Sequence, residues 1–319
     1  MTSQPLFNLA LGAVEAAERA AIAAARLAGR GDKIAADQAA VDAMRKAFND
    51  MPMRGRIVIG EGERDEAPML YIGEEVGTGE GPEIDIALDP LEGTSLTAGG
   101  KPEALTLLAL APRGGLLHAP DTYMDKIAVG PGLPEGIISL DRPIGENIAA
   151  VAQAKGVPAS EITVCVLERE RHQAIIDGIR AAGARIVLIP DGDVAAIIAA
   201  ADPSRPVDMY VGQGGAPEGV LSAAVLRCLG GQIECRLFFR NDDERARAAK
   251  TGIKDLDRKY SGAEMASKDC LFVASGVTGG QLLDAVRHGP GTVTTQTLLL
   301  SSAPRSRRII TTHRFLEGV

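Results

Sequence analysis

The stretch Asp85-Ile86-Ala87-Leu88-Asp89-Pro90-Leu91-Glu92-Gly93-Thr94 alternates polar and apolar residues over its first half, which predicts a β-strand. The proline and the glycine that follow predict a turn. That turn carries two carboxylates, Asp89 and Glu92, beside the hydroxyl of Thr94. Mg²⁺ and Mn²⁺ prefer oxygen ligands of this kind. The stretch therefore indicates a strand that ends in a cation site, and the simpler interpretation is an acidic surface turn.

The composition is that of a globular protein, with 45% apolar and 24% charged residues among 319. This length allows one large domain or two smaller ones with substantial cores. Aromatic residues make up only 3% and Trp is absent, which argues against a stacking surface for single-stranded nucleic acid. The net charge of -8 repels a phosphate backbone. We therefore expect no nucleic-acid partner, although local cations or a metal can still bind a phosphorylated metabolite.

The cysteines and the absence of targeting signals indicate where the protein works. Cys165, Cys228, Cys235 and Cys270 form no Cys-x-x-Cys pair and have no His at zinc spacing. The N-terminus lacks a basic region followed by an apolar core, so no signal peptide is expected. No stretch approaches the roughly 20 apolar residues of a membrane span. We expect a cytoplasmic protein in a reducing environment, with no membrane partner.

The first half of the chain predicts a mixture of helices and short strands. Helices are expected at residues 6–27, 32–48 and 68–76, and strands at residues 56–60, 85–89, 104–111, 116–118 and 123–129. Asp32 is the expected N-cap of the second helix. The Arg-Gly-Gly sequence at residues 113–115 is expected to join the strands on either side of it into an antiparallel hairpin.

Beyond the Gly- and Pro-rich residues 130–136, strand-like and helical runs alternate. Helices are expected at residues 144–154, 172–182, 194–201 and 217–229, and strands at residues 162–167, 185–189 and 207–211. This alternation predicts parallel βαβ units with right-handed crossovers. A charged helical segment at 241–259 and late strands at 271–274 and 292–300 complete the chain. The expected fold is a layered α/β architecture whose two halves meet near residue 160.

Acidic residues gather at the ends of two expected strands. Glu61 and Glu63 follow one strand, and Asp89 and Glu92 follow the other; Asp37 on the second helix and Glu218 after Gly214-Gly215-Ala216-Pro217 are further candidates for the same place. Open α/β sheets bind ligands at such strand ends. Because close carboxylates repel, a shared site needs cations, and two divalent ions can bridge a phosphoryl group and activate a water. The simpler interpretation is that each carboxylate is solvated separately.

The three βα connections of the second half carry groups suited to a phosphorylated ligand. Arg169-Glu170-Arg171-His172 opens a helix and makes an anion site plausible, the alternative being a charge cluster at a helix start. Asp191-Gly192-Asp193 suits sugar hydroxyls, or Asp193 caps the helix. The glycines of Gly212-Gln213-Gly214-Gly215 permit close backbone approach, or form a plain turn. His172 has no accompanying Ser or Cys elbow, so a structural role is expected.

Taken together, these motifs resemble those of the lithium-sensitive, metal-dependent sugar phosphatases. The opening turn matches Asp-Pro-(Ile/Leu)-(Asp/Glu)-Gly-(Thr/Ser). Glu92 in place of Asp, together with Ile59-Gly60-Glu61-Gly62-Glu63 and Gly214-Gly215-Ala216-Pro217-Glu218-Gly219, is similar to the class II fructose-1,6-bisphosphatase branch. The resemblance runs from about the first helix to the C-terminus. It implies a layered αβαβα sandwich of the sugar phosphatase type, in a homo-oligomer such as a dimer or tetramer.

Carried over by motif, the resemblance implies a two-metal site for Mn²⁺ or Mg²⁺. Asp37 and Glu61 match the ligands of one metal, and Asp89, Glu92 and Glu218 those of the other. The implied substrate contacts are Glu92, Gly93, Thr94, Tyr123, Arg169, Glu170, Arg171, Asp191, Gly192, Asp193 and Gly215. Where the family pattern has Lys-Pro-Arg, this chain has Arg169-Glu170-Arg171, which keeps the two cations but changes the phosphate geometry. Residues 1–160 would then form the metal-binding half and residues 161–319 the sugar-phosphate-binding half.

The resemblance also implies an activity. It is hydrolysis of the 1-phosphate of fructose 1,6-bisphosphate by a divalent-metal-activated water, giving fructose 6-phosphate and phosphate; some members also hydrolyse sedoheptulose 1,7-bisphosphate. Thr94 with Glu61 is expected to orient or deprotonate the water, and direct attack by the Thr94 hydroxyl is the alternative. Arg169 and Arg171 would hold the remote 6-phosphate. Competing functions are an inositol-phosphate or phosphoadenosine phosphatase of the same superfamily, and a non-catalytic sugar-phosphate sensor, which would have no need of the carboxylates.

Overall fold

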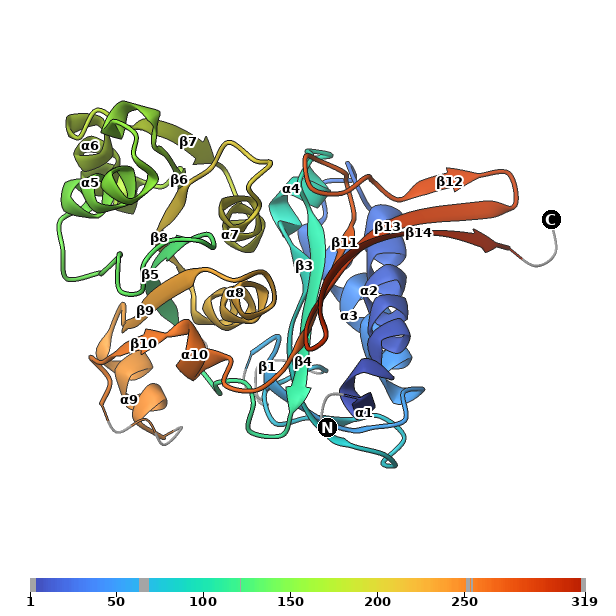
Figure 1. The fold of residues 1–319 in the computed structure, drawn as a ribbon. Helices are drawn as coiled ribbons and strands as arrows, with labels where there is room; N and C mark the ends of the chain where they lie inside the picture. The colour runs from blue at the N-terminus through green and yellow to red at the C-terminus, as the bar shows by residue number, and fades with distance from the viewer. Residues whose placement is uncertain (1–3, 63–68, 121, 251–252, 254, 317–319) are drawn as a thin grey trace. The chain divides into compact units, whose positions relative to one another are not determined.

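The computed structural model describes residues 4–62, 69–120, 122–250, 253 and 255–316 (Figure 1). The chain forms two compact units. The first unit comprises Met1–Leu116 and Lys268–Val319, and the second comprises Leu117–Ser267. The chain therefore leaves the first unit once and returns to it. This partition differs from the expected division near residue 160, because the strand β5 (Tyr123–Val129) pairs with two later strands of the second unit.

The first unit is a mixed sheet with helices packed on it. Its helices are α1 (Gln4–Phe7), α2 (Ala10–Ala25), α3 (Lys33–Asn49) and α4 (Thr94–Ala98). Its strands are β1 (Arg54–Ile59), β2 (Glu75–Val76), β3 (Glu83–Glu92), β4 (Leu105–Pro112), β11 (Leu271–Gly276), β12 (Arg287–Gly289), β13 (Thr292–Ser302) and β14 (Arg305–Phe315). The strand order is β12-β13-β11-β4-β3-β1-β2, and β14 pairs with β13. α2 and α3 bury their small and apolar residues against one face of this sheet (Figure 1).

An irregularity in β3 decides where its carboxylates point. β3 pairs regularly with β4 up to Asp89, opposite Leu107, and the next pair is Glu92 opposite Leu105. Three residue steps on β3 thus face two on β4, which is a β-bulge with one extra residue. Pro90 lies inside it, where a residue without an N–H removes no ladder hydrogen bond. Opposed residues share a face of the sheet, so the bulge places Asp89 and Glu92 on the same face.

The apolar core confirms that the bulge changes the face of the sheet to which the later residues of β3 point. Leu88 and Leu91 of β3 both belong to the apolar cluster under α2 and α3. In an unbroken strand, residues three apart would point to opposite faces. Because the bulge restores Leu91 to the core face, Asp89 and Glu92 point away from the α2–α3 layer.

The second unit is a sheet with helices on both faces (Figure 1). Its strands are β5 (Tyr123–Val129), β6 (Thr163–Leu167), β7 (Arg185–Ile189), β8 (Met209–Gly215), β9 (Gln232–Phe238) and β10 (Lys259–Ser261), in the order β10-β9-β5-β8-β6-β7. Its helices are α5 (Ile144–Lys155), α6 (Gln173–Ala181), α7 (Asp193–Ala201), α8 (Ala216–Leu229), α9 (Asp242–Lys250) and α10 (Gly262–Met265), with 3-10 turns η1 (Ala159–Glu161) and η2 (Glu170–His172).

Each face of this second sheet is covered by one helix pair. Alternate residues of β5, β6 and β8 form an apolar cluster with α5 and α6. The intervening residues, including Lys126 and Tyr210, are buried on the side of α7 and α8. β6 runs parallel to both β7 and β8, so the predicted βαβ units are confirmed, as is the α/β fold class. Most predicted helices and strands are found within a few residues of their expected bounds, including α3 with Asp32 as its N-cap.

Two predicted elements are wrong. The helix expected at 68–76 is absent from its described part, residues 69–76, because Leu70 and Gly73 adopt positive φ angles of 54° and 93°. Pro68 lies outside the described residues. The charged segment at 241–259 is helical only over α9, as far as the described residues show.

The hairpin expected after β4 is also wrong, and a buried carboxylate explains why. Leu116–His118 forms no strand. Instead, Gly114 and Gly115 donate their N–H groups to Oδ2 of Asp85 at 2.5 and 3.2 Å. Asp85 is fully buried in β3, and Arg56 and Arg113 form ion pairs with it at 3.2 and 3.4 Å. The Gly-Gly turn therefore wraps a charged side chain rather than returning the chain along β4.

A charged contact fastens the C-terminal strand to the first long helix. Arg314 of β14 donates to Glu15 at 2.9 Å and to Glu18 at 2.6 Å, both on α2. Glu18 is 1% exposed and also accepts the hydroxyl of Thr312 at 2.7 Å. The hydrogen bond from Arg314 is the main reason that the pKa of Glu15 lies below its usual value of 4.5. The contribution of Glu15 to stability is thus present above that value and is lost as the pH falls through the lowered pKa.

We expect Arg314→Met to destabilise the protein by about 3 kcal/mol at neutral pH, because it leaves the buried Glu18 without its cation. Below the usual pKa of Glu15, the stability of the variant should also fall less with pH than that of the wild type, because Glu15 has lost this hydrogen bond. Urea unfolding over a range of pH measures both effects. Arg308→Met is the matched control on the same strand: its guanidinium lies 5.3 Å from the Phe7 ring, and a loss of at most about 1 kcal/mol is expected. Equal losses in the two variants would contradict this account.

Candidate functional site

In the first unit, two carboxyl groups from different elements meet. Glu61 follows β1, and its N–H donates to the carbonyl of Leu70 at 3.0 Å. Asp37, on α3, hydrogen-bonds to Glu61, and burial raises the pKa of Asp37 above its usual range. Two carboxylates in contact repel unless they share a proton or a cation. Asp37 and Glu61 therefore fit a divalent cation, for which they offer oxygen ligands.

The bulged end of β3 supplies the other carboxylates of this unit. Asp89 is half-buried and accepts the N–H of Leu91 at 3.0 Å. Glu92 is 4% exposed. Gly93 has a φ of 86°, a left-handed conformation that favours glycine, and α4 begins at Thr94 directly after it. The half-buried Thr94 hydroxyl thus lies at the end of the same segment.

The structure brings some of the predicted ligands together. Asp37 meets Glu61, and Asp89 shares a face with Glu92, while Glu218 belongs to the second unit. Among the described residues, no three Asp, Glu, His or Cys side chains lie close enough to hold a metal ion. Glu63, in the same acidic turn as Glu61, lies outside them.

In the second unit, the ends of three parallel strands meet. The N–H of Glu168, just after β6, donates to Ile189 at the end of β7 at 2.8 Å. Nε2 of His172 accepts the N–H of Gln213 in β8 at 2.8 Å, and its Nδ1 lies 2.7 Å from the carbonyl of Leu167. Because Nε2 accepts a hydrogen bond, it carries no proton, so His172 is neutral. The ring joins two strand ends, in agreement with the structural role expected for it.

Predicted substrate contacts project from this edge. Arg171 is exposed and donates to the carbonyl of Gln213 at 2.9 and 3.3 Å. Its guanidinium lies 5.2 Å from the centre of the Tyr123 ring, and that of Arg240 lies 4.8 Å from the same ring. Arg169 is near enough to Asp191 for its charge to act on that carboxyl, whose pKa burial nevertheless raises. Glu170 is exposed. The edge thus presents a cluster of guanidinium groups around one phenol ring.

The connection between β8 and α8 holds Glu218 close to the backbone. A Cβ placed on Gly215 would lie 2.0 Å from Oε2 of Glu218, so this carboxylate folds back over the glycine. Tyr123 pairs with Gly215 across β5 and β8. Glu218 therefore lies at the same end of the sheet as the predicted substrate contacts.

The expectation that Asp193 caps a helix is wrong, and its contact with a sugar stays a prediction. Gly192, with a φ of 86°, is the cap residue of α7, and Asp193 is the first residue of the helix. The Asp193 carboxylate turns inward and lies 2.5 Å from Nζ of Lys126. It is Asp191, half-buried, that remains at the surface of this loop.

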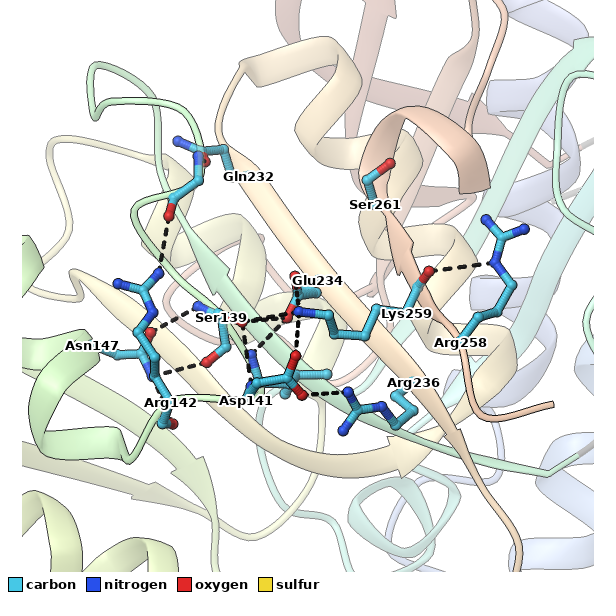
Figure 2. Close-up of polar contacts among 12 residues, drawn as sticks. Ser139, Asp141, Arg142, Asn147, Gln232, Glu234, Arg236, Arg258, Lys259 and Ser261 are labelled. Carbon is cyan, nitrogen blue, oxygen red and sulfur yellow. Dashed lines mark hydrogen bonds and ion pairs between the residues drawn. The ribbon is translucent and has the colours of Figure 1, made fainter. Parts of the chain in front are cut away.

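A cavity of about 560 Å³ in the second unit is lined by residues 130–136, α8, β9 and α10. None of the predicted site residues lines it. Beside it, Lys259 bonds to Asp141 and Glu234 at 2.7 and 3.1 Å (Figure 2). Hydrogen bonds from Lys259 and Arg236 lower the pKa of Asp141 to about 2. The polar side chains shown there bond to one another or to backbone, which is typical of a structural network.

Sequence reasoning missed two cations of the second unit that the contacts single out, Lys126 and Arg240. Lys126 stands in an otherwise mostly apolar strand, and a lysine in such a strand is a usable signal for a buried partner. Arg240 follows β9 in a charged segment, and only the tertiary contact with Tyr123 distinguishes it from the other arginines.

His172→Phe should cost about 2 kcal/mol of stability, because an aromatic ring remains but the Leu167 carbonyl and the Gln213 N–H lose their partner. Burial lowers the pKa of His172 below its usual 6.5. As the pH falls, His172 therefore takes up a proton in the unfolded chain before it does so in the folded protein. The wild type loses stability between the usual pKa of His172 and its lowered pKa. The variant should lack this part of the decline in denaturation curves. The exposed His288→Phe serves as control, and an unchanged pH dependence in His172→Phe would refute the assignment.

None of the described helices is long and apolar enough to cross a membrane. A family model described as "Bacterial fructose-1,6-bisphosphatase, glpX-encoded" matches residues 7–314. The chain is 44% identical to a protein of Synechococcus sp. (strain JA-3-3Ab) named D-fructose 1,6-bisphosphatase class 2/sedoheptulose 1,7-bisphosphatase, covering 98% of this chain and 96% of the relative. It is 45% identical to fructose-1,6-bisphosphatase 1 class 2 of Escherichia coli (strain K12), with 97% and 96% covered. The chain thus belongs to the bacterial, GlpX-type class 2 fructose-1,6-bisphosphatase family.

Proposed function

We propose that this protein hydrolyses the 1-phosphate of fructose 1,6-bisphosphate, and also that of sedoheptulose 1,7-bisphosphate. Family membership supports the reaction, and the name of the Synechococcus relative supports the second substrate. The observation that carries the proposal is the contact between the carboxyl groups of Asp37 and Glu61, which fits a cation at the end of β1. The guanidinium groups around Tyr123 fit an anionic substrate.

The family implies a divalent metal, and we propose Mn²⁺ or Mg²⁺ in a two-metal site. Asp37 and Glu61 would hold one ion, and Asp89, Glu92 and Glu218 the other. All five offer the hard oxygen ligands that these ions prefer. When bound, the cations neutralise charge on the transferring phosphoryl group and make water a better nucleophile.

The residues of the chain then have separate tasks. In hydrolysis, a water oxygen bonds to phosphorus, the bond from phosphorus to the sugar oxygen breaks, and a proton passes from the water to that oxygen. Thr94, with Glu61, orients the water and handles its proton; attack by the Thr94 hydroxyl itself is the less favoured route. Arg169 and Arg171 hold the remote phosphate, and Asp191 accepts hydrogen bonds from sugar hydroxyls. Binding at the remote end positions the reacting end.

We also propose that the enzyme works in the cytoplasm as a homo-oligomer. The four cysteines are free and buried, which suits a reducing compartment. Light scattering of the purified protein measures its mass, and a monomer at working concentration would contradict the oligomer.

The direct test is phosphate release by the purified protein from both bisphosphates, with Mn²⁺, with Mg²⁺ and after chelation. We expect turnover that needs metal and yields fructose 6-phosphate. The same assay includes inositol 1-phosphate and 3′-phosphoadenosine 5′-phosphate. Faster release from either would favour the competing phosphatases, and binding of the bisphosphates without turnover would favour a sensor.

Arg171→Ala should raise KM for fructose 1,6-bisphosphate about 10- to 100-fold with little change in kcat, since a charge-assisted phosphate contact is worth roughly 1.5–3 kcal/mol. Hydrolysis of fructose 1-phosphate, which lacks the remote phosphate, should hardly change. Arg180→Ala, exposed on α6, is the matched control. An effect confined to kcat, or an equal effect on the two substrates, would remove Arg171 from the remote-phosphate site.

Thr94→Val keeps the shape of the side chain but deletes its hydroxyl. We expect kcat to fall on the order of 10²–10⁴-fold while metal and substrate binding persist. Thr94→Ser, which keeps the hydroxyl, should retain activity. Kinetics are measured beside thermal stability, because Thr94 also begins α4. A folded and fully active Thr94→Val enzyme would show that the hydroxyl only closes the turn.

A further inference from the structure

Lys126 is a lysine whose side chain is entirely buried. It lies in the middle of β5 with 0% exposure, and its Nζ is 2.5 Å from Oδ2 of Asp193. The hydroxyl of Tyr210 lies 3.4 Å from the same carboxylate oxygen. Removing both charges of such a pair in favour of apolar side chains is often neutral or stabilising. Stability alone is therefore a weak reason for a charged pair at this place.

The backbone that carries Glu218 lies directly on this pair. A Cβ on Gly214 would be 2.5 Å from Oδ2 of Asp193 and 3.1 Å from Nζ of Lys126. A Cβ on Gly219 would be 3.7 Å from Cε of Lys126. Gly214 thus lets the end of β8 rest directly on the ammonium group and its carboxylate partner, and Gly219 of α8 lies within van der Waals distance of the lysine stem while it packs most tightly on Sδ of Met124.

The charge of Glu218 also reaches Lys126. Burial acts to lower the pKa of Lys126, but the charges of Asp193 and Glu218 outweigh it and raise the pKa. The charges of two carboxylates, from the starts of two helices, thus act on one buried cation. Asp193 begins α7 after Asp191 and Gly192, and Glu218 lies in the first turn of α8.

We propose that Lys126 is a positioning residue, whose buried ammonium group fixes Asp193 and the Gly214–Gly219 connection and thereby holds Glu218 in its metal-binding orientation. Asp193 accordingly acts through Lys126 rather than by touching the sugar. This inference rests on the proposed function, in which Glu218 is a metal ligand.

The proposal predicts a change in metal affinity that is opposite to the change expected from charge alone. Removing a positive charge near a metal ligand should, by charge alone, tighten the binding of a divalent cation. Loss of positioning should instead weaken it. We expect Lys126→Met to raise the Mn²⁺ dissociation constant about tenfold, which corresponds to roughly 1.4 kcal/mol.

The experiment counts free Mn²⁺ by electron paramagnetic resonance, without substrate, in three variants and the wild type. Lys126→Met leaves Asp193 buried and unpaired, which is destabilising. The double variant Lys126→Met/Asp193→Leu removes both charges and should recover thermal stability. The control is Lys155→Met, which breaks the more exposed pair of Lys155 with Asp208 in the same unit and should leave Mn²⁺ affinity unchanged.

Weak Mn²⁺ binding in the double variant, despite recovered stability, would support positioning. Wild-type or tighter Mn²⁺ affinity in the folded double variant would overturn it and leave the pair a merely structural feature. The proposed function fails separately, if the wild type neither binds Mn²⁺ nor releases phosphate from the bisphosphates.

Discussion

The one extra residue in β3 is the constraint on which the first unit's site depends. A strand buried on one face by α2 and α3 must keep an alternating pattern of apolar residues. Without the bulge, that pattern would send one of Asp89 and Glu92 into the α2–α3 core, where an ionised carboxylate is costly. With the bulge, Leu88 and Leu91 both stay in the core and both carboxylates leave it. Pro90, which has no N–H to donate, lies within this irregularity.

The second unit combines arginines at one end of its sheet with a buried ion pair in its interior. Arg171 and Arg240 flank the Tyr123 ring, while Lys126 and Asp193 pair in the interior, on the side of the sheet that faces α7 and α8. His172 ties the ends of β6 and β8 through their backbones. Rigid strand ends of this kind hold a ligand site more closely than free loops do.

Sequence alone predicted what local pattern determines. The βαβ units follow from alternating periodicity, and the acidic turns follow from short motifs with a chemical reason. It could not predict what long-range contacts determine. Asp85 accepts hydrogen bonds from Gly114 and Gly115, and the hairpin that the local residues favour does not form. The bulge is visible only when β3 is aligned with β4. The inward turn of Asp193 depends on Lys126, which is 67 positions away in the chain.

The central claim is that the carboxylates bind divalent cations for phosphate-ester hydrolysis. Anomalous diffraction from crystals grown with Mn²⁺ tests it most directly. The account predicts one peak at Asp37 and Glu61 and another at Asp89, Glu92 and Glu218. Peaks elsewhere in an enzyme that Mn²⁺ activates, or a Glu218 carboxylate outside the coordination of every ion, would contradict it.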